Sequence, residues 1–142
     1  MKVKYYDLEN KRVFVTGGGS GIGASIVEHF CEQGSEVYFI DINVSESEKL
    51  IEDIKNKKYS IPTFIECDLL NIKQLQKTIV DIIDQKGPID ILINNAANDT
   101  RHKIDDVTEE YWNERMNVNL RHYFFTVQSV KKSMIENKGG VI

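Results

Sequence analysis

The chain has 142 residues, of which 41% are hydrophobic and 28% charged, a balance typical of one globular domain with its own core. Its net charge of −4 comes with no basic block, which argues against nucleic acid as a partner. The N-terminal stretch MKVKYYDLENKR is too polar for a signal peptide or a membrane span, so no membrane association is expected.

The first predicted strand is the β-branched apolar run RVFVTG, residues 12–17. A helix is predicted over residues 21–33, and Gly34 is placed to end it in the left-handed conformation. We expect the buried face of this helix to carry the apolar residues that repeat every four positions, Ile22, Ile26 and Phe30.

The second strand is EVYFID, residues 36–41. Ser45 and Glu48 form a capping box, which predicts that a helix starts there and runs to about Lys58. The third strand is IPTFIECD, residues 61–68, and its proline cannot donate a ladder hydrogen bond. The third strand is therefore expected at an edge of the sheet.

Asn71 is predicted to cap a third helix, which Gly87 and Pro88 stop. The fourth strand and its exit loop are IDILINNAAN, residues 89–98. The apolar face of the third helix is expected to carry Leu75, Ile79 and Ile82.

A polar connection, residues 98–106, leads to a long helix predicted over 109–137, with Thr108 as its N-cap. We expect Gly139 and Gly140 to end this helix. The closing GGVI then opens a fifth strand.

Strands alternate with helices throughout, and several strands are apolar almost end to end. This pattern predicts an α/β fold with a doubly wound, Rossmann-like parallel sheet. We expect residues 1–142 to form a single dinucleotide-binding domain, truncated within the fifth strand, with the C-terminal part of the fold missing.

Cys31 and Cys67 stand inside apolar runs and fit neither a metal spacing nor a redox pair. Both are expected to be reduced, buried thiols, which predicts a cytoplasmic protein. His29 and His122 fall on predicted helices with no acidic or cysteine ligands nearby, so no metal site is expected.

The stretch VFVTGGGSGIG lies between the first strand and the first helix, where a phosphate-binding turn belongs. A tight turn without a ligand is the alternative, although a plain turn needs fewer glycines and so loses less backbone entropy. Two registers fit: GxGxxA uses Gly19, Gly21 and Ala24, and TGxxxGxG uses Thr16, Gly17, Gly21 and Gly23.

Asp41 ends the second strand, where the adenosine ribose of a dinucleotide would lie. Its carboxylate can accept hydrogen bonds from both ribose hydroxyls and would repel a 2′-phosphate. Neither the glycine loop nor DINVSES carries an Arg or Lys, so NAD is predicted over NADP. A plain turn residue is the alternative role for Asp41.

With these features the chain resembles the short-chain dehydrogenase/reductase family over its whole length. The matching stretches are TGGGSGIG, CDL, NNAAN (with Ala97 where the family usually has Gly) and VNL. The resemblance implies that Asp68 binds the adenine amine, that Asn94 and Asn95 brace the sheet, and that Asn119 is catalytic and anchors a water. It implies cofactor contacts from Gly17, Ser20, Gly21, Ile22, Gly23, Asp41, Ile42, Asp68, Leu69, Asn95, Ala96 and Ala97.

Asn119 also stands out without the resemblance, because it interrupts an apolar stripe on the long helix. A polar amide on a buried face must be hydrogen-bonded, so a satisfied core asparagine is the alternative to a functional one. The stripe consists of Trp112, Met116, Tyr123, Val127, Val130 and Met134.

A narrower similarity joins the chain to the aldose 1-dehydrogenase branch, through ND-x-RH after the fourth strand and YW…NLRH in the long helix. It implies a sugar oxidised at C1, with Asn98 as a substrate contact. Arg101 and His102 would lie near the mouth of the site, with a solvated loop or a subunit contact as the alternative for both.

The resemblance implies hydride transfer between a nicotinamide and a small-molecule alcohol or carbonyl carbon, aided by a Ser and a Tyr-x-x-x-Lys pair. The 142 residues contain no Tyr-x-x-x-Lys. We therefore expect an NAD-dependent oxidoreductase by family and an inactive chain in isolation. A non-catalytic NAD-binding module or the remnant of a disrupted gene is the alternative. The resemblance further implies a homo-oligomer.

Overall fold

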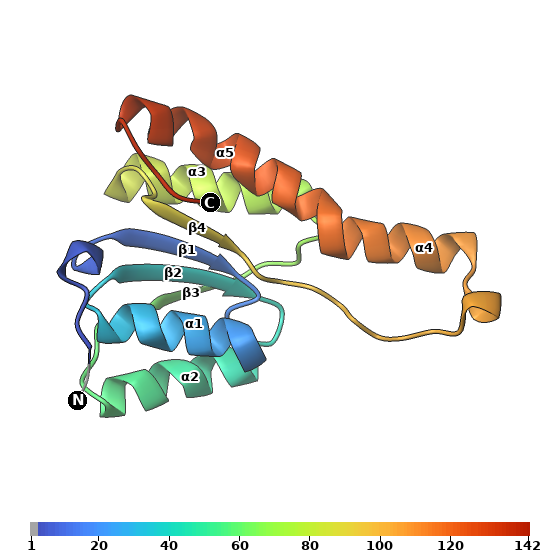
Figure 1. Ribbon diagram of the computed structural model, residues 1–142, viewed down its shortest axis with the longest axis horizontal. Coiled ribbons are helices and arrows are strands. Elements are labelled where there is room, and N and C mark those ends of the chain that lie inside the picture. Colours follow the sequence, from blue (N-terminus) through green and yellow to red (C-terminus); the bar gives the residue numbers. More distant parts are fainter. Residues whose placement is uncertain (1–2) are drawn as a thin grey trace.

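The computed structural model describes residues 3–142 and contains a four-stranded parallel sheet in the order β3-β2-β1-β4 (Figure 1). The strands are β1 (Arg12–Thr16), β2 (Glu36–Asp41), β3 (Thr63–Glu66) and β4 (Ile91–Asn94). β3 lies at the edge, as predicted from the proline before it. This order is that of one half of a doubly wound sheet and part of the other, which confirms the predicted fold class.

A fifth strand begins beside β4. Val141 pairs in parallel with Ile91. The N–H of Leu92 donates to the Val141 carbonyl, and the N–H of Val141 donates to the Asp90 carbonyl, both at 2.9 Å. The closing residues therefore continue the sheet on the β4 side, as the apolar ending predicts.

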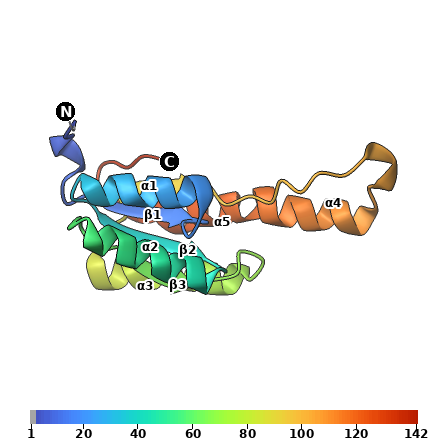
Figure 2. The same cartoon turned by 90° about the horizontal axis from the view of Figure 1, so that it is seen from below.

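Residues 3–142 form five α-helices, which cover the sheet or extend from it: α1 (Gly21–Glu32), α2 (Val44–Asn56), α3 (Ile72–Lys86), α4 (Glu109–Met116) and α5 (His122–Glu136). α1 and α2 pack on one face of the sheet, and α3 and α5 pack on the other (Figures 1 and 2). α4 and the connection before it project away from the sheet, beyond the carboxyl ends of the strands. None of the helices in residues 3–142 is long and apolar enough to cross a bilayer.

The alternation of side chains along the strands feeds two cores, as a two-residue period requires. Val13, Val15 and Phe39 pack toward α1 and α2, and Phe14 and Ile40 pack toward α3 and α5. All five are fully buried, and burying a side chain of this kind stabilises the fold by about 1.5–3 kcal/mol.

The buried face of α1 is only partly the predicted one, because Ile26 and Phe30 are half-buried against the core but Ile22 is not. Ile22 is 76% exposed, and the buried residues are Gly23, Val27 and Cys31. Gly23 lets the first turn of α1 approach the β1 loop closely, which turns the 23–27–31 row inward. A four-residue apolar repeat cannot distinguish two adjacent rows of a helix.

The start of α2 also differs from the prediction. The cap is Asn43, whose Oδ1 accepts the Glu46 N–H at 3.2 Å, and not Ser45. Asn43 is held in place because its own N–H donates to Asp41 at 2.9 Å. The helix therefore begins before the capping box can form.

The other predicted caps are confirmed. Asn71 and Thr108 each accept a first-turn amide, and Gly34 and Gly87 take φ values of +85° and +99°. At the end of α5, however, the left-handed residue is Lys138, with φ +60°, and not Gly139 or Gly140.

The predicted long helix is interrupted by a π-helical turn, Asn117–Arg121, between α4 and α5. The apolar stripe predicted along it is buried only in its α5 part: Val130 and Met134 are buried, whereas Trp112 is 60% exposed. The reason is that α4 extends past the sheet and has no core to face.

Both cysteines are buried and free, as expected. Burial raises the pKa of Cys31 to about 12 and that of Cys67 to about 11, so neither is a thiolate at neutral pH.

His122 provides a pH-dependent contribution to stability, because burial lowers the pKa of its imidazole from the ordinary 6.5. As pH falls below about 6.5, the unfolded state binds more protons than the native state. The free energy of unfolding then decreases by at most about 1.4 kcal/mol per pH unit. Urea unfolding at about pH 7.5 and about pH 5.5 should show a smaller loss for His122→Asn than for wild type. Exposed His29→Asn is the control, and an equal loss in wild type and His122→Asn would contradict the account.

Candidate functional site

The candidate site lies where the carboxyl ends of β1 and β4 meet, at the point where strand order reverses in such sheets. The Thr16 hydroxyl oxygen accepts the N–H groups of Asn95 at 3.0 Å and Ala96 at 3.1 Å. The Asn95 side-chain amide donates to the carbonyls of Thr16 at 3.1 Å and Gly17 at 2.9 Å. These bonds tie the β1 loop to the end of β4, so the bracing role expected of Asn95 is confirmed.

Asn94 braces a different pair of elements. Its Oδ1 accepts a hydrogen bond from the Thr126 hydroxyl at 2.8 Å, which joins the end of β4 to α5. Thr126 is fully buried. The two adjacent asparagines therefore hold β4 to β1 and to the helix above it.

The glycine loop has no room for side chains where it meets β4. A Cβ on Gly17 would lie 2.8 Å from the Cα of Ala96, and one on Gly23 would lie 1.9 Å from the Gly17 carbonyl oxygen. Gly17 and Gly21 also have positive φ, +64° and +54°. Gly19, which only GxGxxA uses, is crowded by side chains, since a Cβ there would lie 2.5 Å from Ser47 Oγ. Gly17 and Gly23, which only TGxxxGxG uses, are crowded by backbone atoms that cannot move aside, and this favours the TGxxxGxG register.

The N-terminus of α1 is left open. Its N-cap, Ser20, makes no side-chain capping bond, whereas α2, α3 and α4 are capped by Asn43, Asn71 and Thr108. The first amides of a helix have no intrahelical acceptor and carry a partial positive charge. Together with the glycine cradle, the open N-terminus of α1 fits the pyrophosphate of a dinucleotide.

Asp41 lies at the end of β2, beside this loop. Its Oδ2 accepts the Gly19 N–H at 2.8 Å and its Oδ1 accepts the Asn43 N–H at 2.9 Å. Each oxygen keeps a lone pair for a further donor. Ile42, next to it, is 70% exposed and forms an apolar surface at the same edge.

Asp68 and Leu69 follow β3 at the same edge. The N–H of Cys67 donates to the Asp41 carbonyl at 3.1 Å, which brings the β3 exit beside the β2 exit. Asp68 is exposed and its Oδ1 accepts the Leu70 N–H at 2.9 Å. The structure thus gathers the expected adenosine-side residues around one end of the sheet.

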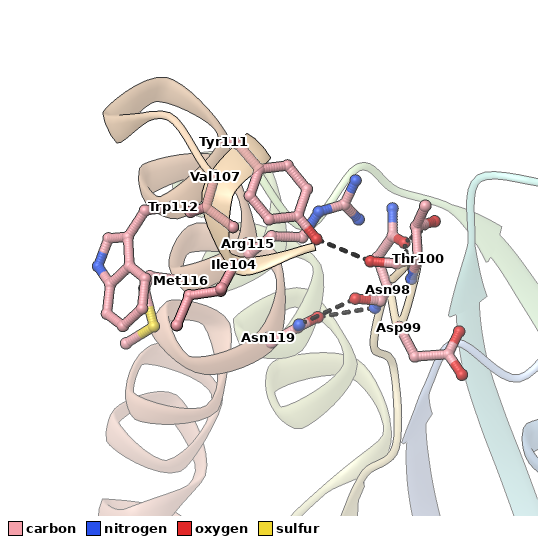
Figure 3. A pocket seen from close by; sticks show the side chains of 10 residues that line it. All are labelled: Asn98, Asp99, Thr100, Ile104, Val107, Tyr111, Trp112, Arg115, Met116 and Asn119. Atoms are coloured by element: carbon pink, nitrogen blue, oxygen red, sulfur yellow. Dashed lines mark hydrogen bonds between the residues drawn. The ribbon is translucent and has the colours of Figure 1, made fainter. Parts of the chain in front are cut away.

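Asn119 lies in the π-helical turn and pairs with the backbone of Asn98 (Figure 3). Its Oδ1 accepts the Asn98 N–H at 2.7 Å, and its Nδ2 donates to the Asn98 carbonyl at 3.0 Å. The expected catalytic residue and the expected substrate contact are therefore in direct contact. The Asn98 side chain turns the other way and accepts from Thr100.

Beyond Asn119, the connection and α4 enclose an open hollow of about 520 Å³. The Arg115 guanidinium stacks on the Tyr111 ring at 4.8 Å, and the Tyr111 hydroxyl donates to the Thr100 carbonyl at 2.7 Å (Figure 3). Arg101 and His102 are exposed on the connection, outside the set of residues that line the hollow. The lining consists of Asn98, Asp99, Thr100, Ile104, Val107, Tyr111, Trp112, Arg115, Met116 and Asn119.

The sequence patterns missed two features of this site. Thr16 was part of a motif but was not expected to act, although it accepts two amides from the β4 exit. A hydroxyl at the end of an apolar strand is the signal that could have indicated it. The π turn has no reliable sequence signature, so the break at Asn119 could not be predicted.

Comparisons with known proteins agree with this geometry. Residues 11–142 match the short chain dehydrogenase family. D-xylose 1-dehydrogenase of Caulobacter vibrioides is 44% identical over 138 residues, which cover 97% of this chain and 54% of the relative. "Probable galactose dehydrogenase GalD" of Rhizobium meliloti is 42% identical over 139 residues, with 98% and 54% covered.

A solved structure gives the same result for the fold. The crystal structure of gox2181 superposes with a TM-score of 0.86 at 26% identity, over 96% of this chain and 55% of that one. The chain thus spans about half the length of the curated relatives it matches. The glycine cradle, the braced β4 exit and these matches lead to one conclusion: the chain belongs to the short-chain dehydrogenase family, with similarity to its sugar dehydrogenases.

Proposed function

We propose that this chain binds NAD at the carboxyl edge of the sheet and forms the cofactor-binding part of a dehydrogenase that oxidises a sugar at C1. The observation that carries the proposal is the uncapped N-terminus of α1 behind a glycine loop in which Gly17 and Gly23 leave no room for side chains. When bound, NAD supplies the hydride-accepting carbon. The chain itself supplies the groups that bind the cofactor and hold it in its orientation.

The roles of the cofactor contacts follow from their positions. Amides at Ser20, Gly21 and Ile22 would face the pyrophosphate, and Asp41 would accept the ribose hydroxyls. Asp68 and Leu69 would line the adenine pocket, and the backbone at Ala96 and Ala97 would run alongside the nicotinamide ribose. NAD is favoured over NADP because the Asp41 carboxylate would lie against a 2′-phosphate, with no Arg or Lys in the glycine loop or in residues 41–47 to neutralise it.

Two observations support a sugar substrate. The relatives named above are sugar dehydrogenases, and Asn98 lies beside Asn119 at the mouth of the site. An amide side chain suits a polyol, which offers several hydroxyls as donors and acceptors. Asn119 would take part in proton transfer by holding a water, and its side chain fixes the Asn98 backbone.

Asp41→Asn tests the cofactor site and its selectivity. Loss of one charge-assisted acceptor should weaken NAD binding about tenfold or more and narrow the preference for NAD over NADP. Isothermal titration calorimetry of the 142-residue chain measures both affinities, with exposed Asp84→Asn on α3 as the matched control. Equal affinity of the wild-type chain for NAD and NADP would contradict the selectivity, and an unaffected Asp41→Asn would contradict the site.

We expect the isolated chain to bind NAD without turnover, since its 142 residues contain no Tyr-x-x-x-Lys. When the chain is mixed with NAD and either D-xylose or D-galactose, the fluorescence of NADH should stay at background. Measurable NADH formation by the purified chain would refute this expectation. The alternative functions are distinguished by the titration, because a binding module retains NAD affinity and a gene remnant does not.

A homo-oligomer is the proposed assembly, supported by an exposed apolar row along α4, the π turn and α5. Trp112, Met116, Leu120 and Phe124 follow one another turn by turn, and Phe124 is 64% exposed. A row of large apolar side chains exposed to water favours association with another such surface. A second copy of this chain presents the same row.

Phe124→Glu tests the assembly. A charge at the α5 end of the row should shift the chain toward monomer, because an unpaired buried carboxylate opposes association. Sedimentation velocity over a range of concentrations measures the shift, with Val80→Glu on α3, 43% exposed in the wild type, as the control. A wild-type chain that stays monomeric at all concentrations would contradict self-association through this row.

A further inference from the structure

His122 has no role in the candidate site described above, and its surroundings are unusual. It is fully buried at the end of the π turn, three residues after Asn119. Its Nδ1 lies 2.7 Å from the Val118 carbonyl, which can only accept, so Nδ1 carries the proton and donates. Its Nε2 has no hydrogen-bond partner among residues 3–142.

Such a donor is well placed to stabilise a π turn. In an α-helix each carbonyl accepts the amide four residues later, whereas in a π turn the bonds run to the fifth residue. When the α pattern resumes, one carbonyl is left without an amide. A carbonyl left unpaired where water cannot reach it costs about 1–3 kcal/mol. The Val118 carbonyl, inside the turn, has the fully buried His122 imidazole as a donor.

We propose that His122 is a positioning residue for Asn119: its Nδ1–H satisfies the Val118 carbonyl and thereby holds the π turn that directs the Asn119 amide at the Asn98 backbone. A return to regular α-helix would rotate Asn119 relative to α5 by about a quarter of a turn. The two hydrogen bonds to Asn98 could not survive that rotation.

The π turn lies between two residues that are hydrogen-bonded to other parts of the fold. The Thr126 hydroxyl donates to Asn94 at 2.8 Å and fixes α5 against the end of β4. Asn119 holds Asn98, four residues further along the exit loop. The π turn adds one residue to the helix between these two anchors.

A second histidine in the chain shows what the contact alone does. His29 Nδ1 lies 2.7 Å from the Ser25 carbonyl, the same four-residue spacing, yet α1 remains a regular helix there. His29 is exposed, and water can replace its contact. The contact therefore does not create a π turn by itself, and His29 serves as a matched control for His122.

The tautomer of His122 tests the proposal in the wild-type chain. Nitrogen NMR of the 142-residue protein should show His122 neutral at pH 7, with the proton on Nδ1 and a scalar coupling across the hydrogen bond to the Val118 carbonyl carbon. A proton on Nε2 would overturn the proposal. This measurement requires no variant to fold.

Substitutions test the effect on Asn119. His122→Leu should speed hydrogen exchange of the Asn98 amide about tenfold or more, because the Asn119 bond is lost. His122→Asn places an amide near the position of Nδ1 and should restore protection to within about threefold of wild type. His29→Leu should leave Asn98 unchanged. Unaltered protection of the Asn98 amide in His122→Leu would overturn the proposal. So would a folded His122→Asn variant in which the Asn98 amide loses as much protection as it does in His122→Leu.

The relevance of this positioning to hydride transfer rests on the function proposed above. The hydrogen-exchange and NMR measurements use no cofactor and no substrate. Failure of the chain to bind NAD would therefore contradict the proposed function and leave the role of His122 unaffected. Failure of the His122 tests would contradict the positioning role and leave the proposed function unaffected.

Discussion

The arrangement depends on the contact between the ends of β1 and β4. The side chains of Thr16 and Asn95 make four hydrogen bonds to backbone groups there. Gly17 lies so close to Ala96 that no side chain would fit at position 17. Backbone groups that would otherwise be buried without partners are satisfied by these bonds. The contact fixes the direction in which the chain leaves each strand, and so fixes the glycine loop on one side and Asn98 on the other.

The two sides of this contact have different physical characters. On the β1 and β2 side, glycines, an open helix N-terminus and one carboxylate form a rigid surface suited to phosphate and ribose. On the β4 side, Asn119 and Asn98 join a loop to a helix that is distorted at that point. A π turn in a helix is frequently found at a functional site, because it turns a side chain that regular geometry would aim elsewhere.

The strands and most helix ends could be predicted because they depend on local chemistry. Apolar β-branched runs, Asn71, Thr108, Gly34 and Gly87 each determine the conformation of their own segment. The start of α2 was predicted wrongly because Asp41 holds Asn43 in place, and a tertiary contact of this kind leaves no mark in the capping pattern.

The errors on α1 and on the long helix have a common cause. The most deeply buried row of α1 runs through Gly23, which approaches Gly17 too closely for a side chain, and Ile22 at the start of the predicted row is exposed. On either side of the break, Asn119 and Thr126 bond to residues from β4 and its exit loop, far away in the sequence. Periodicity predicts that a helix exists, but it does not contain this information.

Chemical-shift mapping during a titration with NAD tests the central claim most directly, because it locates the ligand on the chain. We predict that the amides of residues 17–23 and of Asp41 and Ile42 shift together and saturate with one affinity. The amides of the hollow beside α4 should move less. Shifts confined to that hollow, or none in the glycine loop at saturating NAD, would contradict the account.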